Sequence, residues 1–305
     1  MSDICITAAK RTAVGSLGKS LRKVSAHDLG SSVISETLKF NNLEKNNVDE
    51  IIMGQVLTSA CGQNPARQAA IKSGIPKEKT AYVVNQVCGS GIRSIVSGFQ
   101  SIKSGDSSIV VAGGQENMSL APHAIHLRNG KKLGDDKLID TMIKDGLWDA
   151  FHGYHMGVTA ENVAEKFQIT REAQDKFALK SQEKALMAQK ENKFREEIIN
   201  LKIKSNKSEV NFNKDEHPRE GISIETLSKL KPVFKKDGTV TAGNASGIND
   251  GAATVTLMSS KEAEKRNIKK LVSIKSWASC GVDPALMGTG PIPSSKKALD
   301  LAGWN

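Results

Sequence analysis

Residues 85–95 read NQVCGSGIRSI and directly follow the apolar stretch AYVV at 81–84. Apolar residues at helical spacing continue after them, so the segment has the pattern of a strand that turns sharply into a helix. Cys88 stands at the turn, and Gly89 and Gly91 remove side chains that would crowd it. The segment therefore predicts an α/β unit, in which Cys88 either fills space in the core or is presented for chemistry.

Other parts of the chain repeat the order of strand and helix. Short β-branched runs predict strands at ICITAA (4–9), EIIMGQV (50–56), AYVVNQV (81–87), SSIVVAGG (107–114), AATVTLMSS (252–260) and LVSIKSWAS (271–279). Helical spacing marks 26–40, with Ser25 as a candidate N-cap, and 90–105. Strands that alternate with helices indicate the α/β class with a buried, largely parallel sheet.

The composition and the hydrophobic pattern of the sequence change between about Ser119 and Gly247. The stretch HLRNGKKLGDDKL (126–138) is polar and rich in turn residues, and an amphipathic helical pattern follows at 170–194. From 271 the order of strand, long loop and helix seen at 3–40 returns in a second copy that ends after its helix. We therefore expect three parts: an N-terminal domain (1–118 plus 249–268) carrying the cysteine, an inserted loop domain (119–248), and the start of an incomplete C-terminal domain (269–305).

Composition narrows the classes of function. The 305 residues contain 38% hydrophobic and only 4% aromatic residues, so a core must be built from aliphatic side chains. No run reaches the roughly 18 apolar residues of a membrane helix, and MSDICITAAKRT lacks the pattern of a signal peptide. We therefore expect a cytoplasmic protein without a membrane partner.

The net charge of +10 is compatible with a phosphorylated small molecule as ligand or with a solvated, lysine-rich surface. Nucleic acid is disfavoured, because the basic residues are dispersed and aromatic stacking residues are few. The four cysteines form no CxxC pair and no cluster with histidine, which argues against a metal site and against a disulfide framework.

The surroundings of Cys88 leave two interpretations open. Unpaired N–H groups at a helix start and the helix dipole would favour a thiolate there. The same amides would stabilise an oxyanion on a carbonyl bound to the sulfur, as in a serine nucleophile elbow. A lone cysteine beside a strand is, however, commonly a small buried hydrophobe. Cys5 lies inside an alternating strand pattern and is expected in the core, whereas Cys61 and Cys280 lie in loops without a helix start.

Seven segments together resemble the thiolase family. They are NQVCGSGIRSI with VVAGGQENMS (110–119), AAKRTAVGSLGKSL (8–21), GQVLTSACGQNPARQAA (54–70), HGYHMGVTAENVAEKF (152–167), GTVTAGNASGINDGAA (238–253) and GVDPALMGTGPIPSSKKAL (281–299). The resemblance implies a duplicated α/β fold, layered αβαβα, with an inserted loop domain and here an incomplete second half. Within the family, the stretch 126–157 is most like the bacterial acetyl-CoA acetyltransferases, which condense two acetyl-CoA into acetoacetyl-CoA and also catalyse the reverse cleavage.

The resemblance also assigns roles to individual residues. Cys88 aligns with the nucleophile that carries an acetyl group as a thioester, with its own backbone N–H as one oxyanion donor. Coenzyme A is implied as part of the substrate, with no permanently bound cofactor and no metal. The residues that the resemblance places along coenzyme A and the acyl group are Arg219 at the adenine end, Ser246 at the pantetheine amide with Ala242 and Ile248 beside it, His155, Met156 and Met287 around the acyl group, and Leu147 in the channel. From composition alone, Arg219 would be a solvated side chain, and His155 with Met156 would be packed interior residues.

The loop LRNGKKLGDDK (127–137) is similar to the family's assembly loop and implies a homotetramer built from dimers. Three family elements do not occur in the 305 residues: an Asn-Glu-Ala-Phe segment that holds a catalytic water, a Gly-His-Pro histidine that activates the nucleophile, and a second catalytic cysteine in Cys-x-Gly. We therefore expect this chain to be part of a longer protein and to lack condensing activity by itself.

Two alternatives remain open. The first is a broad-range 3-ketoacyl-CoA thiolase of fatty-acid degradation, which differs in the length of the acyl chain that it accepts. The second is a non-catalytic coenzyme A-binding fragment that kept the fold and lost the chemistry. The absence of the three family elements favours this second alternative, whereas the intact turn around Cys88 disfavours it.

Overall fold

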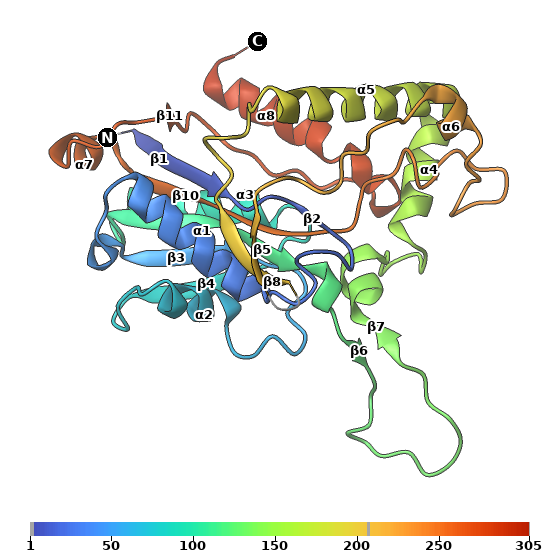
Figure 1. Cartoon of the computed structure of the whole chain (residues 1–305), viewed down its shortest axis with the longest axis horizontal. Helices are drawn as coiled ribbons and strands as arrows, with labels where there is room; N and C mark the ends of the chain where they lie inside the picture. Colours follow the sequence, from blue (N-terminus) through green and yellow to red (C-terminus); the bar gives the residue numbers. More distant parts are fainter. Residues whose placement is uncertain (1–2, 206–207, 305) are drawn as a thin grey trace. The chain divides into compact units, whose positions relative to one another are not determined.

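Figure 1 shows the computed structural model of the chain, which describes residues 3–205 and 208–304. The chain forms two compact units, each built from three segments. The first unit comprises Met1–Gly146, Glu196–Asp215 and Ile248–Ile274, and the second comprises Leu147–Arg195, Glu216–Gly247 and Lys275–Asn305. The three-part domain division that the sequence predicts stays a prediction.

The first unit is organised around a seven-stranded sheet with the order β11-β1-β10-β5-β3-β4, and β2 pairs with β10 beside this path. Its strands are β1 (Ile4–Arg11), β2 (Gly15–Ser16), β3 (Glu50–Gly54), β4 (Thr80–Val84), β5 (Ile109–Asn117), β10 (Asn249–Ser259) and β11 (Val272–Ser273). The predicted strand at 271–279 is therefore reduced to a two-residue edge pairing with β1.

The sheet is mixed, so the expectation of a largely parallel sheet is wrong. β3 runs parallel to both β4 and β5, as α/β units predict. β10 runs antiparallel to both β1 and β5 along most of its length. The reason is the route of the chain. Parallel neighbours need a crossover connection. β10 instead enters the sheet after the long segment 119–248 and is free to run in the opposite direction.

Helices cover both faces of this sheet. α1 (Ala26–Phe40) and α2 (Pro65–Lys72) pack with Ile51 and Met53 of β3 in one core cluster. α3 (Ser90–Ser104) packs on the other face, where Ile52 points. Alternation along β3 thus sends successive side chains to opposite cores, which is the pattern of a sheet buried on both faces. The predicted N-cap is confirmed, because Ser25 Oγ accepts the N–H of Asp28 at 3.2 Å.

Short elements complete the first unit and its boundary. They are η1 (Lys45–Asn47), η2 (Met118–Leu120), β6 (His123–Ala124), β7 (Ile139–Asp140), the π-helical turn η3 (Met142–Leu147), the hairpin β8 (Leu201–Ser205) and β9 (Ser208–Phe212), and α7 (Ser260–Lys265). Arg11, at the end of β1, donates to both carboxylate oxygens of Asp215, at 2.8 and 3.1 Å. This pair ties the segment after β9 to the central sheet.

The second unit is mainly helical. It contains α4 (Met156–Lys166), α5 (Arg171–Lys190), α6 (Ile224–Ser228), η4 (Pro284–Thr289) and α8 (Pro291–Ala302). The predicted amphipathic helix is α5, which begins after Thr170, whose Oγ1 accepts the N–H of Ala173 at 3.2 Å. η4 packs on α4, where Asn162 Nδ2 donates to the carbonyl of Ala285 at 3.1 Å. No helix among the described residues combines the length and apolar character that a membrane crossing requires.

Candidate active site

The turn between β4 and α3 is a strained elbow. Val87 has φ 47°, a left-handed conformation that is unfavourable for a β-branched residue and costs about 1–3 kcal/mol. Polar side chains hold this conformation. The N–H of Val87 is donated to Asn85 Oδ1 at 2.9 Å, and Ser90 Oγ donates to the carbonyl of Val87 at 2.6 Å. The N–H of Gln86 is donated back to Ser90 Oγ at 2.9 Å, so Ser90 closes the turn from both sides.

Cys88 follows Val87 directly and is exposed to solvent. Cys5 is fully buried in the first core cluster, as the strand pattern predicts, and Cys61 and Cys280 are only partly exposed. The elbow therefore presents Cys88 at the surface of the first unit and does not use it to fill a core.

The elbow also narrows the set of oxyanion donors. The N–H of Gly89 is donated to the carbonyl of Gln86 at 3.0 Å, and that of Ser90 to the carbonyl of Val87 at 3.1 Å. These two amides are used inside the turn, so the expectation that the helix-start N–H groups all face the thiol is wrong for both. The N–H of Cys88 itself remains the predicted donor.

The start of α3 lies almost in contact with the sheet. A Cβ added at Gly54, the last residue of β3, would stand 2.5 Å from the carbonyl carbon of Ser90. Ser94 Oγ lies 2.6 Å from the carbonyl oxygen of Gly113 in β5 and 2.7 Å from that of Gly91. Since real Cβ atoms do not approach backbone this closely, only glycine at 54 allows the helix to start directly above the sheet. The elbow is thus fixed to β3 and β5.

A carboxyl group that the sequence analysis did not single out lies at the same edge of the sheet. Glu116 Oε2 accepts the N–H of Val56 at 2.8 Å, and Oε1 accepts that of Leu57 at 3.1 Å. Burial raises the pKa of Glu116 to about 7, against the lowering effect of these two hydrogen bonds and with a smaller raising effect of the Asp250 charge. An acidic residue straight after the apolar run of β5 was the available signal.

In the second unit, His155 and Met156 open α4. His155 is the N-cap, and its Nδ1 accepts the N–H of Gly157 at 3.0 Å. The imidazole stacks on Phe234, with 4.7 Å between ring centroids, and burial lowers the pKa of His155. The neutral ring, with Nδ1 as acceptor, therefore carries its proton on Nε2, which is left as a donor.

Leu147, predicted in the coenzyme A channel, and Met287, predicted around the acyl group, belong to the same unit. Leu147 is partly buried and precedes Trp148, which forms an isolated antiparallel bridge with His155. Met287 is exposed in η4, the element that packs along α4. The structure thus brings His155, the N-cap of α4, and η4, which carries Met287, to the same helix.

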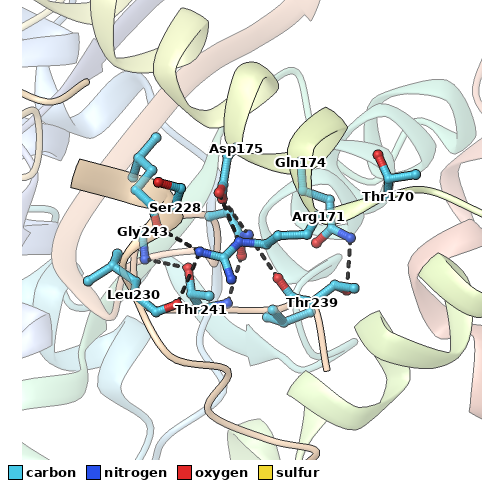
Figure 2. A network of polar contacts seen from close by, with 12 residues as sticks. Thr170, Arg171, Gln174, Asp175, Ser228, Leu230, Thr239, Thr241 and Gly243 are labelled. Atoms are coloured by element: carbon cyan, nitrogen blue, oxygen red, sulfur yellow. Dashed lines mark hydrogen bonds and ion pairs between the residues drawn. The ribbon is translucent and has the colours of Figure 1, made fainter. Parts of the chain in front are cut away.

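Figure 2 shows a polar network between α5 and the segment of Thr239, Thr241 and Gly243, and Ala242 and Ser246 belong to the same loop. Asn244 Nδ2 donates to Asp175 Oδ1 at 2.9 Å, and Arg171 Nε donates to Asp175 Oδ2 at 2.8 Å. Ala242 and Ser246 are both exposed on this loop. A rigid loop with an exposed hydroxyl group is suited to bind a polar ligand.

A second carboxylate anchors the beginning of the same loop. Glu161 of α4 accepts the N–H groups of Thr239 and Val240, each at 2.8 Å. Burial raises the pKa of Glu161, but the hydrogen bonds from Val240 and Thr239 outweigh it and the net shift is downward. Glu161 therefore acts as an ionised clamp at neutral pH.

Arg219 is exposed, and its backbone N–H is donated to Gln182 Oε1 of α5 at 3.0 Å. Ile248 is partly buried and begins the last segment of the first unit, to which Cys88 also belongs. The remaining predicted coenzyme A residues, namely Arg219, Ser246, Ala242, His155, Met156, Met287 and Leu147, belong to the second unit.

Comparisons with known proteins agree with the motifs. The family model described as "Thiolase, N-terminal domain" matches residues 4–261. An acetyl-CoA acetyltransferase of Rhizobium meliloti (strain 1021) is 56% identical over 99% of this chain and 77% of its own length. A cytosolic acetyl-CoA acetyltransferase of Rattus norvegicus is 51% identical over 99% of this chain and 77% of its own length.

A solved structure gives the same result for the fold. The crystal structure of the Bacillus anthracis acetyl-CoA acetyltransferase superimposes with a TM-score of 0.97 at 42% sequence identity, covering 100% of this chain and 77% of the other. Sequence and fold agree over both units, and the expected α/β fold is confirmed. This chain belongs to the thiolase family.

Proposed function

We propose that this protein is an acetyl-CoA C-acetyltransferase in which Cys88 carries the acetyl group. The observation that carries the proposal is the strained elbow, which exposes a single cysteine of the described residues after β4, an edge strand of the sheet. The names of relatives that are 50–56% identical to this chain support acetyl-CoA as the substrate. Membership of the thiolase family supports a covalent mechanism, in which one difficult step is divided into two.

In the first step, the Cys88 sulfur attacks the thioester carbonyl of acetyl-CoA, and the carbonyl oxygen becomes an oxyanion. The bond from carbon to the coenzyme A sulfur then breaks, coenzyme A leaves as the thiol with the proton that Cys88 lost, and acetyl-Cys88 remains. In the second step, another acetyl-CoA loses a methyl proton and its carbon attacks acetyl-Cys88; we expect this chain by itself to lack the acid–base groups that this step requires. Acetoacetyl-CoA forms, and the sulfur of Cys88 regains a proton.

The second unit supplies groups suited to hold coenzyme A, and we assign it that role. The neutral imidazole of His155 offers its Nε2–H as a donor for a carbonyl oxygen. Ser246 offers an exposed hydroxyl for the pantetheine amide, on a loop held by Glu161 and Asp175. Arg219 is exposed and positively charged, which suits the nucleotide end of the coenzyme.

The proposal is tested by following acetyl transfer itself. The full chain is incubated with acetyl-CoA, release of coenzyme A is measured, and the acetylated residue is located by peptide mass spectrometry. We expect the acetyl group on Cys88 and no release with Cys88→Ala, whereas the matched variant Cys280→Ala retains full transfer. Acetylation of Cys61 or Cys280 in the wild type, or unchanged release with Cys88→Ala, would refute the assignment.

We also propose a cytoplasmic homotetramer. The loop between β6 and β7 belongs to the expected inserted domain and exposes Leu127, Leu133 and Leu138, with Leu133 at 92% exposure. A hollow of about 420 Å³ lies in the same loop, lined by residues 125–129. Exposed leucines on a long loop are typical of a surface that packs on another subunit. Light scattering compares the molar mass of Leu133→Asp with that of the wild type, and we expect the variant to form smaller assemblies. An unchanged mass would count against a role of this loop in assembly.

A further inference from the structure

Glu116 is a partly buried ionisable group at the edge of the sheet where the elbow lies, and the mechanism above does not use it. β3, β4 and β5 run parallel, so their carboxyl ends meet at one edge. Cys88 follows β4, Val56 and Leu57 follow β3, and Glu116 lies near the end of β5. Ligand sites of open α/β sheets form at such edges.

A short chain of contacts connects Glu116 with the elbow. The carboxylate binds the N–H groups of Val56 and Leu57. The preceding residue, Gln55, donates its N–H to the carbonyl of Val84, the last residue of β4, at 3.2 Å. Gly54 lies directly under Ser90 at the start of α3. The segment that Glu116 holds is therefore in contact with both ends of the turn that carries Cys88.

We propose that Glu116 is a positioning residue for acyl transfer, whose carboxylate holds the segment 54–57 and through it the backbone of the elbow at Cys88. The proposal rests on the proposed function, because acyl transfer at Cys88 is the reaction that it serves. Its role is geometric. An oxyanion donor works only when it is held within a few tenths of an ångström of its place, so a loosened elbow slows acyl transfer.

The clamp depends on ionisation. The carboxylate accepts both amides, whereas a protonated carboxyl group has one oxygen that donates and no longer accepts an amide at full strength. The pKa of Glu116, raised by burial to about 7, puts this change in the neutral range. The titratable groups that face it are Asp250 of the neighbouring β10 and Cys61 of the loop after β3.

Glu116→Gln separates this role from others, because an amide side chain keeps the size of the carboxyl group and accepts only one of the two N–H groups. We expect acetylation of Cys88 at pH 8 to be about fivefold slower in this variant, as for one lost hydrogen bond to a charged group. The ratio of wild-type to variant rates should fall toward one below pH 6. Glu78→Gln, an exposed acid in the same unit, is the matched control and should follow the wild type.

Alkylation of Cys88 by iodoacetamide needs no oxyanion donor, so its rate should be equal in the wild type and Glu116→Gln. A ratio of acetylation rates that is constant with pH, or alkylation slowed as much as acetylation, overturns the positioning role. If the wild type is not acetylated at Cys88, the proposed function fails. Hydrogen exchange then tests separately whether the Glu116 carboxylate holds the segment 54–57 and the elbow. Faster amide exchange in peptides covering 54–61 and 85–95 of Glu116→Gln supports the clamp, and unchanged exchange overturns it.

Discussion

Asn244 Nδ2 donates to Asp175 Oδ1 at 2.9 Å, while Arg171 Nε donates to the other carboxylate oxygen, Oδ2, at 2.8 Å. Asp175 is buried, so both of its oxygens are satisfied by protein groups. Arg171 also donates to the carbonyl of Leu227 at 2.6 Å, which brings the chain after α6 into the same network. One carboxylate in α5 thereby fixes the loop that leads to Ser246.

Replacing Asp175 by alanine should loosen this loop and weaken coenzyme A binding. The change leaves the guanidinium of Arg171 and the amide of Asn244 without their partner, and we expect a loss of about 2–3 kcal/mol in the free energy of unfolding. Urea unfolding and calorimetric titration with coenzyme A measure the two effects. Glu172→Ala removes an exposed acid of the same helix and should change neither; weakened binding in that control would mean that charge, not the network, is responsible.

The order of strands and helices could be predicted because it depends on local periodicity, and α1 and α3 lie where the spacing puts them. The direction of β10 could not be predicted, because it depends on how the chain returns to the sheet after the segment 119–248. The stretch 271–279 has β-branched residues but pairs only at Val272–Ser273, since strand formation depends on an available neighbour.

The site was predictable to a similar degree. The exposure of Cys88 follows from a strand, glycines and a helix start that are adjacent in sequence. The strained φ of Val87 leaves no local signal, because a β-branched residue is disfavoured there. The environment of Glu116 is created by Val56 and Leu57, about 60 positions earlier in the chain. A single sequence does not show such long-range partners.

Val87→Gly should stabilise the protein while slowing acyl transfer. Glycine adopts the φ of 47° without strain, which recovers about 1–3 kcal/mol, and its greater freedom in the unfolded state costs about 0.5–1 kcal/mol. We expect a net gain of about 1 kcal/mol in the free energy of unfolding, measured in urea. Val87→Ala keeps a Cβ and most of the strain, so a gain as large as that of glycine would show that the strain is not located there.

Gly54→Ala and Gly91→Ala are a matched pair on the two sides of the contact between β3 and α3. A Cβ at Gly54 would stand 2.5 Å from the backbone of Ser90, whereas no described atom lies within 4 Å of a Cβ at Gly91. We expect Gly54→Ala to cost about 1–3 kcal/mol by overpacking and to reduce Cys88 acetylation strongly. Gly91→Ala should fold at least as stably as the wild type, since alanine favours the helix. Equal unfolding midpoints for the two variants would contradict this account.

Glu116 should make the stability of the protein fall as the pH rises from about 4.5 to about 7. Burial raises the pKa of Glu116 from its ordinary value of 4.5 to about 7, so the folded state holds a proton in this interval that the unfolded state has lost. The contribution is complete below pH 4.5 and disappears as the pH passes 7, which amounts to on the order of 2 kcal/mol for a partly exposed group. Urea unfolding of the wild type and of Glu116→Gln across this interval isolates the effect, because all other carboxyl groups are common to both. The free energy of unfolding of Glu116→Gln should rise steadily relative to that of the wild type as the pH rises. A difference between the two free energies that is constant with pH would place the pKa of Glu116 outside the interval.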